Sequence, residues 1–326
     1  MLFTQRRTSP FRFALLLVCV TSLAGFSACR SGLPQSQGVN QLLKAETLLP
    51  EKTEEPSATP GLVNPSSSIT PPSPQTTPEG TEIPTEKSTD LITIRVVFDN
   101  YPYQDGLDTG WGFSAYVTYK DFNVLFDTGA SGSVLLRNMA ALSIKPEGIQ
   151  NVVLSHQHND HTAGLQHVLS AGANPKIYLP PSFSSSFKNQ FNHQAEVIEV
   201  TPGFPIAERI STSGEIPGSP PEQALVIDTT RGLIVITGCA HPGVEKMVLA
   251  AKRYFKEDVY LVMGGFHLGG ASTEEVIRII KEFKRIGVVQ VAPCHCTGDR
   301  AIRQFKEAFG DNFIRLGVGA VIEIET

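Results

Sequence analysis

Residues that can bind metal ions are concentrated in one short stretch of the sequence. Positions 156 to 161 hold three histidines and one aspartate, namely His156, His158, Asp160 and His161. The apolar residues 152–154 in front of them predict a short buried strand. Because side chains alternate along a strand, its end can direct His156 and His158 to one point, while Asp160 and His161 follow on the turn into the next helix. This arrangement indicates a metal centre with room for a second ion, rather than a polar turn that happens to be rich in histidine.

Three further histidines follow predicted strands in the second half of the chain. They are His241, His267 and His295, each within a few residues of an apolar stretch that ends in a turn. Active sites of sheet proteins collect at strand ends, because the turns there direct side chains into one crevice. We therefore expect these three histidines in the site, and His167 and His193 outside it.

The run HxHxDH is the signature of the metallo-β-lactamase superfamily, and the chain resembles that superfamily over about Leu91 to Thr326. Within the superfamily it is similar to the branch named for 7,8-dihydropterin-6-methyl-4-(β-D-ribofuranosyl)aminobenzene 5'-phosphate synthase. The motifs that carry this resemblance are Phe126-Asp-Thr-Gly129, Leu154 to Leu165, Gly214-Glu-Ile-Pro217, Gln223-Ala-Leu225, Gly238-Cys-Ala-His241, Gly264-Gly-Phe-His-Leu268 and Pro293-Cys-His-Cys-Thr-Gly298.

The resemblance implies a set of metal ligands. One ion would take His156, His158 and His241, and a second would take Asp160, His161 and His295. Such a donor set suits Zn²⁺ or a similar divalent ion. The candidate catalytic residues are Asp127, Asp160 and His267. Asp160 is also a metal ligand, and His267 is a ligand or a substrate contact. Asp127 is expected to hold a ligand histidine by its second ring nitrogen.

The sequence departs from the common superfamily pattern at two positions. Phe204 stands where a typical member has the histidine of a PGH turn, and Cys239 stands where a typical member has an aspartate after glycine. The third ligand of the first ion would therefore move to His241. Cys239 would lie near the place of the usual bridging aspartate.

A divalent ion with an open coordination position lowers the pKa of bound water toward about 7. The sequence therefore predicts a hydrolase that uses metal-bound hydroxide on an ester, amide or phosphoester of a small molecule. The alternatives are a transferase like the synthase of the resembled branch, and a metal-binding lipoprotein without turnover. A redox di-iron site is disfavoured because the candidate ligands include few carboxylates.

Cys239, Cys294 and Cys296 each lie within two residues of a histidine. An odd number of cysteines without a CxxC motif does not indicate a disulfide framework. Site chemistry and simple burial near strand ends both remain open for these three.

The amino-terminal part differs in composition from the rest of the 326-residue chain, whose net charge of −5 gives no basic surface for nucleic acid. Residues 1–29 combine basic residues, an apolar stretch and a lipobox-like end at Cys29, which predicts a signal peptide and a lipid anchor on that cysteine. Residues 30–90 are rich in Pro, Ser, Thr and Glu and predict a disordered tether. These features predict an exported bacterial protein, attached to a membrane and facing the exterior or the periplasm.

Residues 91–326 alternate between strand and helix patterns. Strands are expected near 91–98, 114–119, 123–126, 152–154, 176–179, 195–200, 224–228, 233–237, 259–262, 288–291 and 320–324. Helices are expected near 163–170, 244–255, 272–286 and 299–309, with another between residues 130 and 145. Strand clusters in both halves predict an α/β fold, an αββα sandwich of the metallo-β-lactamase type. Residues 181–192 are expected to form a mobile loop facing the substrate.

Overall fold

The computed structural model describes residues 90–326. The predicted signal peptide 1–29, the lipid anchor at Cys29 and the predicted tether, except for Asp90, lie outside the described residues. Among the helices of residues 90–326, none is both long enough and apolar enough to cross a membrane.

The first sheet has seven strands in the order β13-β1-β2-β3-β4-β5-β6. Their bounds are β1 Leu91–Phe98, β2 Ser114–Tyr119, β3 Phe122–Phe126, β4 Asn151–Val153, β5 Lys176–Leu179, β6 Glu196–Glu199 and β13 Val321–Glu325. β1, β2 and β13 pair antiparallel, whereas β3 to β6 run parallel.

The second sheet has six strands in the order β12-β11-β10-β9-β8-β7. Their bounds are β7 Pro205–Ala207, β8 Ile210–Thr212, β9 Leu225–Thr229, β10 Gly232–Thr237, β11 Val259–Gly265 and β12 Gln290–Cys294. β10, β11 and β12 are parallel to one another. The carboxyl ends of these three strands therefore meet at one edge of the sheet.

Seven α-helices and three short 3-10 helices complete the described part of the chain. The α-helices are α1 Gly132–Ala141, α2 Asn159–Thr162, α3 Leu165–Ser170, α4 Ser185–Phe191, α5 Val244–Phe255, α6 Thr273–Ile286 and α7 Asp299–Phe309. The 3-10 helices are η1 Pro146–Gly148, η2 His295–Thr297 and η3 Gly310–Asn312.

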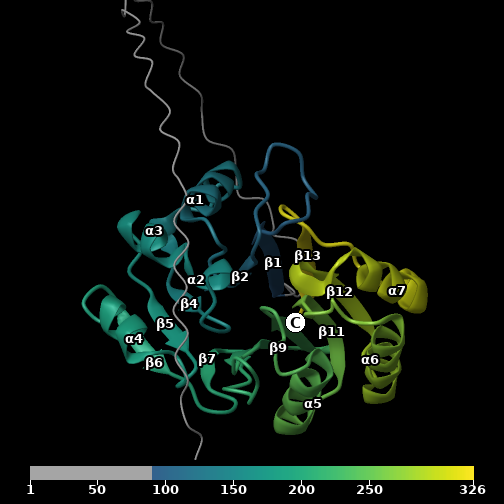
Figure 1. Ribbon diagram of the computed structural model, residues 1–326. Helices are drawn as coiled ribbons and strands as arrows, with labels where there is room; N and C mark the ends of the chain where they lie inside the picture. Colours follow the sequence, from purple (N-terminus) through teal and green to yellow (C-terminus); the bar gives the residue numbers. More distant parts are fainter. Residues whose placement is uncertain (1–89) are drawn as a thin grey trace, which may run out of the picture. The chain divides into compact units, whose positions relative to one another are not determined.

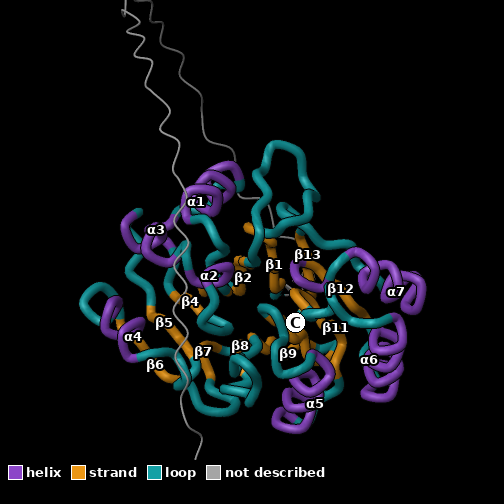
Figure 2. Tube along the Cα trace, viewed as in Figure 1, coloured by secondary structure: helices purple, strands orange, loops and turns teal. Residues whose placement is uncertain are grey.

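The two sheets pack face to face, and helices cover their outer faces (Figures 1 and 2). Buried apolar side chains of both sheets, such as Phe126 and Ile234, form the central core. A second cluster joins α1, α3 and α4 to the first sheet, and a third joins α5, α6 and α7 to the second. The predicted αββα sandwich is therefore confirmed.

Helix α6 illustrates how local sequence determines an element. The Ser272 hydroxyl caps it by accepting a hydrogen bond from the backbone N–H of Glu275, and Gly287 ends it at a φ of 91°. Its buried residues are spaced three or four apart, so that one apolar face packs onto the sheet.

Several elements were not expected from the sequence, among them β7, β8 and α4. β7 and β8 have three residues each, too few for a clear alternation. The expectation of a mobile loop at 181–192 is wrong, because this segment contains α4. The Ser184 hydroxyl caps α4, and Phe183 and Phe191 are 3% exposed in the core. The aromatic spacing from Phe187 to Phe191 was the signal for this helix.

Candidate metal centre

All the sequence-predicted site residues lie near carboxyl ends of parallel strands. From the first sheet, Asp127 follows β3, and the segment 155–161 follows β4 and enters α2. From the second sheet, Cys239 and His241 follow β10, His267 follows β11, and His295 follows β12. The site thus forms where the two sheets present the same kind of strand end.

One set of donor atoms consists of Asp160, His161, Cys239 and His295. The Oδ2 atom of Asp160 lies 3.6 Å from Nε2 of His161 and 3.4 Å from Nε2 of His295. The Sγ atom of Cys239 lies 3.1 Å and 3.4 Å from the same two nitrogens. These four side chains can converge on one ion.

A second set contains His156, Cys239 and His241, with His158 beside it. Nε2 of His156 lies 3.2 Å from Nδ1 of His158. The His241 ring centroid lies 4.7 Å from that of His156 and 4.8 Å from that of His158. His241 Nε2 is buried and has no hydrogen-bond partner among the described residues. An unpaired nitrogen of this kind fits a metal ligand, since buried polar groups otherwise find partners.

The protonation of His156 and His241 also suits metal binding. Burial lowers the pKa of His156, and the neighbouring imidazoles lower it further. Burial, followed by the proximity of His267 and His158, lowers the pKa of His241 to about 4. Both side chains are therefore neutral near pH 7, the form of imidazole that coordinates a metal.

Three histidines are oriented through the ring nitrogen that does not face the site. Nδ1 of His161 lies 2.7 Å from Oδ2 of Asp127, and Nδ1 of His295 lies 2.9 Å from Oδ1 of Asn100. Nδ1 of His156 lies 2.9 Å from Oγ of Ser155. Because the Ser155 hydroxyl already donates to Asp127, it accepts from His156. In all three rings this leaves Nε2 free to coordinate.

Asp127 is fully buried, and its carboxylate contacts both Ser155 and His161. Its Oδ1 accepts a hydrogen bond from the backbone N–H of Ser155 at 2.7 Å, and its Oδ2 accepts one from the Ser155 hydroxyl at 2.7 Å. The sequence predicted that Asp127 holds a ligand histidine by its second ring nitrogen, and the structure places its carboxylate against Nδ1 of His161.

Four of the eight non-glycine residues with positive φ in residues 90–326 lie at the same strand ends. Asp127, Ala240, His267 and His295 have φ values of 54°, 63°, 55° and 48°, in the left-handed region that side chains with a Cβ seldom adopt. Such conformations persist where the surrounding structure enforces them, often at functional sites.

Glu222 is a site residue that the sequence analysis missed. This fully buried carboxylate accepts hydrogen bonds from the backbone N–H groups of Gly238, Cys239, Ala240 and His241 at 2.9–3.0 Å. Burial raises its pKa to about 7, although those hydrogen bonds oppose the shift. Glu222 thereby fixes the loop that carries two donor side chains. Its sequence neighbourhood gives no sign of this contact across 16 or more positions.

Asn100, Ser155 and Trp111 were also missed. Asn100 and Ser155 orient histidines, as described above. Trp111 is 59% exposed, and its ring centroid lies 4.9 Å from that of His295. The sequence offered one signal for Trp111, namely that it is the single Trp of the chain.

The remaining predicted residues divide into those at the site and those away from it. The His267 ring centroid lies 4.2 Å from that of His241, and His267 forms a third set of donor atoms with Cys239 and Cys296. Cys294 is buried outside these three sets, and all three cysteines are free thiols. His167 and His193 are exposed and also lie outside the sets, as expected.

The fold and this cluster define a class of metal-binding α/β proteins with histidine, aspartate and cysteine donors at the strand ends of a sandwich. The sequence profile of the metallo-beta-lactamase superfamily matches residues 109–244, and the chain belongs to that superfamily.

Individual relatives agree with this assignment. The chain is 30% identical to 7,8-dihydropterin-6-methyl-4-(beta-D-ribofuranosyl)-aminobenzene-5'-phosphate synthase of Methanocaldococcus jannaschii, with 61% of this chain and 84% of the relative covered. It is also similar to the crystal structure of a metal-dependent hydrolase of the beta-lactamase superfamily, with 30% identity, a TM-score of 0.62, and 72% of this chain and all of that chain covered. The crystal structure of the metallo-beta-lactamase fold protein YhfI from Bacillus subtilis aligns at 17% identity with a TM-score of 0.55. The alignment covers 72% of this chain and 99% of that chain.

Proposed function

We propose that this protein is a hydrolase that depends on two divalent metal ions, with Zn²⁺ the best match to its donors. The observation that carries the proposal is the convergence of five imidazoles, Asp160 and Cys239 from both sheets into two sets that share the cysteine sulfur. Imidazole and thiolate donors favour zinc, whereas magnesium and calcium favour sites built from oxygen.

The ligand roles follow the two sets. His156, His158 and His241 would hold one ion, and Asp160, His161 and His295 would hold the other. Cys239 lies between them and is available to both. When bound, such ions lower the pKa of water toward about 7 and polarise an ester, amide or phosphoester centre.

The other residues of the site position these ligands or meet the substrate. Asp127, Ser155 and Asn100 keep three imidazoles in one orientation and one tautomer. Trp111 and His267 are accessible at the edge of the cluster. We propose that they contact the substrate, with the exposed indole packing against an apolar or planar portion of it.

A transferase reaction is the second candidate. It is supported by the 30% identity to the synthase of Methanocaldococcus jannaschii. The metal-dependent hydrolase with a similar structure supports the first candidate at the same identity and over all of its length. A metal-binding lipoprotein without turnover is the third, and its anchor at Cys29 remains a prediction from sequence.

The first experiment measures metal content. Elemental analysis of protein purified without added metal should find about two zinc ions per chain. The variant His158→Ala should contain less, whereas His193→Ala, in which an exposed histidine outside the site is changed, should match the parent. An absence of metal from the parent would contradict the proposal.

The second experiment separates the three candidate functions. Metal-loaded parent, His158→Ala and His193→Ala are assayed with esters, lactams and phosphodiesters, and separately with a dihydropterin and a ribosylated aminobenzoate phosphate. Hydrolysis that requires His158 but not His193 supports the hydrolase. Condensation without hydrolysis indicates the transferase, and tight metal binding with neither reaction indicates a binding protein.

A further inference from the structure

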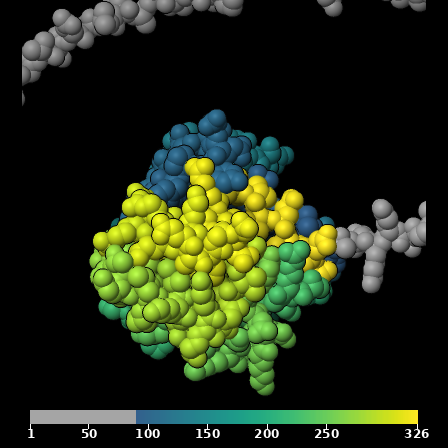
Figure 3. Space-filling model, turned by 90° about the vertical axis from the view of Figure 1, so that its right-hand side faces the viewer, coloured from purple at the N-terminus to yellow at the C-terminus, as the bar shows by residue number. Residues whose placement is uncertain are grey.

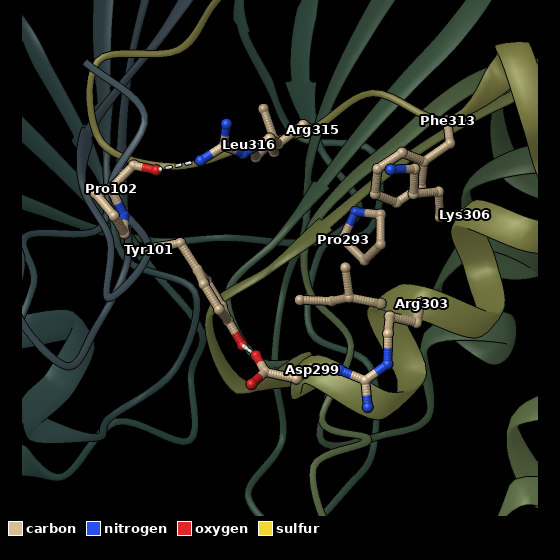
Figure 4. A pocket seen from close by; sticks show the side chains of 10 residues that line it. Tyr101, Pro102, Pro293, Asp299, Arg303, Lys306, Phe313, Arg315 and Leu316 are labelled. Carbon is tan, nitrogen blue, oxygen red and sulfur yellow. Dashed lines mark hydrogen bonds between the residues drawn. The ribbon is translucent and has the colours of Figure 1, made fainter.

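A cavity of about 450 Å³ lies outside the metal centre. Helix α7 and the segment 313–316 line it on one side, and the turn after β1 lines it on the other (Figure 4). Figure 3 shows this side of the molecule, where residues near 100 meet the carboxyl-terminal part. None of the proposed metal ligands lines the cavity, whose volume is typical of sites for small organic molecules.

The lining of the cavity combines an apolar wall with cationic groups. Pro293, Phe313 and Leu316 supply apolar surface, and Arg303, Lys306 and Arg315 supply positive charge. Figure 4 shows Arg303 and Arg315 toward opposite ends of the group, with Pro293 between them.

The described residues neutralise the positive charge of this cavity only in part. Within residues 90–326, no carboxylate forms an ion pair with Arg303, Lys306 or Arg315. Asp299 is the one acidic residue in the lining, and Oδ1 of this side chain accepts a hydrogen bond from the Tyr101 hydroxyl at 2.8 Å. Arg315 donates to the carbonyl of Pro102 at 3.0 Å and keeps further N–H groups for a ligand.

The charges indicate the class of ligand. Three cations and one carboxylate leave a local excess of two positive charges, in a chain whose net charge is −5. A phosphate monoester carries nearly two negative charges at neutral pH, and arginine binds phosphate through paired hydrogen bonds. The apolar wall suits a ring or a short hydrocarbon attached to that phosphate.

We propose that this cavity is a second binding site, which takes a small phosphate monoester with an apolar body. The phosphate lies on the α7 side of the cavity, against Arg303 and Lys306, and the apolar body lies against Pro293 and Phe313, toward Arg315 (Figure 4). The site does not depend on the reaction at the metal centre. It adjoins that centre, however, because Tyr101 follows Asn100 in the chain and Pro293 precedes His295 by two positions.

The test uses phenyl phosphate as the probe and isothermal titration calorimetry of the full chain as the measurement. We expect saturable binding at this site. Arg303→Gln and Lys306→Gln should each raise the Kd about tenfold, as for loss of a charge-assisted hydrogen bond. Arg253→Gln removes an exposed arginine from α5, outside the cavity, and should change the Kd by less than about twofold.

Further measurements locate the ligand and test its two parts. His158→Ala should leave binding at the cavity intact. If His158→Ala no longer bound phenyl phosphate while both cavity variants still bound it, the probe would lie at the metal centre. That result would overturn the proposal. The proposal also fails if phenyl phosphate does not bind, if inorganic phosphate binds as tightly, or if uncharged benzyl alcohol does. Thermal melting of each variant verifies that it is folded.

Discussion

Cys239 belongs to all three sets of donor atoms at the metal centre. Its Sγ lies 3.1 Å from Nε2 of His161 and 3.4 Å from Nε2 of His295. A thiolate is a soft, anionic ligand, so at this position it would favour zinc over the harder divalent ions. In the proposed centre, this single side chain would contribute to metal selectivity, and it lies between the two sets.

Replacement of this sulfur should be visible by spectroscopy. With Co²⁺ in place of the native metal, the parent should show a thiolate-to-cobalt charge-transfer absorption, and Cys239→Ser should lose it. Metal affinity should fall by at least about tenfold, because even an outer partner of a ligand contributes that much. Cys294→Ser changes a buried thiol outside the donor sets and should keep the absorption. Persistence of the absorption in Cys239→Ser would show that the sulfur is not a ligand.

Asp127 contacts His161, and in the proposed centre it would act through that ligand rather than by contact with the metal. The variant Asp127→Asn keeps the size of the side chain but removes the negative charge that accepts from Nδ1 of His161. We expect the affinity for zinc to fall about 10–100-fold, as measured by competition with a chromogenic chelator. Asp228→Asn, an exposed change on β9, is the control and should leave the affinity unchanged. Equal affinities of Asp127→Asn and the parent would exclude the proposed role.

At the scale of elements, the turn after β10 packs closely against the turn after β4, with Gly238 next to Ser155. A Cβ atom on Gly238 would lie 2.1 Å from Oγ of Ser155 and 2.9 Å from Oδ2 of Asp127. The two strand ends can approach this closely only because residue 238 has no side chain.

Gly238→Ala should therefore disturb both stability and metal binding. We expect the free energy of unfolding to fall by about 1–3 kcal/mol from overpacking, measured as a shift of the urea midpoint. Bound metal should fall as well, because Ser155 and Asp127 orient ligand histidines. Gly148→Ala is the matched control, since its Cβ would meet nothing within 4 Å. If both variants behaved like the parent, the close approach of the two turns would not matter for the site.

The elements that position the site could largely be predicted from sequence, whereas the contacts between them could not. The strands before His156 and Cys239 are continuous apolar runs with clear turns, so local pattern was sufficient. The strand before His295 contains Gln290, and it spans Gln290–Cys294 rather than the expected 288–291. The roles of Glu222 and Asn100 depend on tertiary pairing, with His295 lying 195 positions from Asn100. No local propensity reports a contact of that separation. The short strands β7 and β8 could not be predicted for a different reason. Three residues are too few to show the two-residue alternation of a strand.

At the scale of the whole molecule, the metal centre connects the two sheets. His156, His158, Asp160 and His161 follow β4 of the first sheet, whereas Cys239, His241 and His295 follow β10 and β12 of the second. Within the sandwich the sheets are otherwise joined mainly by apolar packing of the central core. Ions bound by both sheets would add a link that exists only in the folded state.

Removal of metal should accordingly destabilise the entire sandwich. A ligand present at about 100 times its Kd stabilises the native state by about 2.7 kcal/mol. For a domain of 150–250 residues, each kcal/mol changes the Tm by about 2–4 °C. Differential scanning calorimetry should thus show the Tm of the parent about 5–10 °C lower after chelation, with recovery when zinc is restored.

His158→Ala and His193→Ala distinguish an effect of the centre from a general effect of the chelator. His193→Ala should lose as much Tm on chelation as the parent does, because its change is outside the site. His158→Ala should begin with a lower Tm at the same zinc concentration and lose less on chelation, since weaker binding leaves less stabilisation to remove. If all three proteins responded equally, the metal would not act through this centre. A response confined to proteins with an intact site would show that the sheets are coupled through the ligands they share.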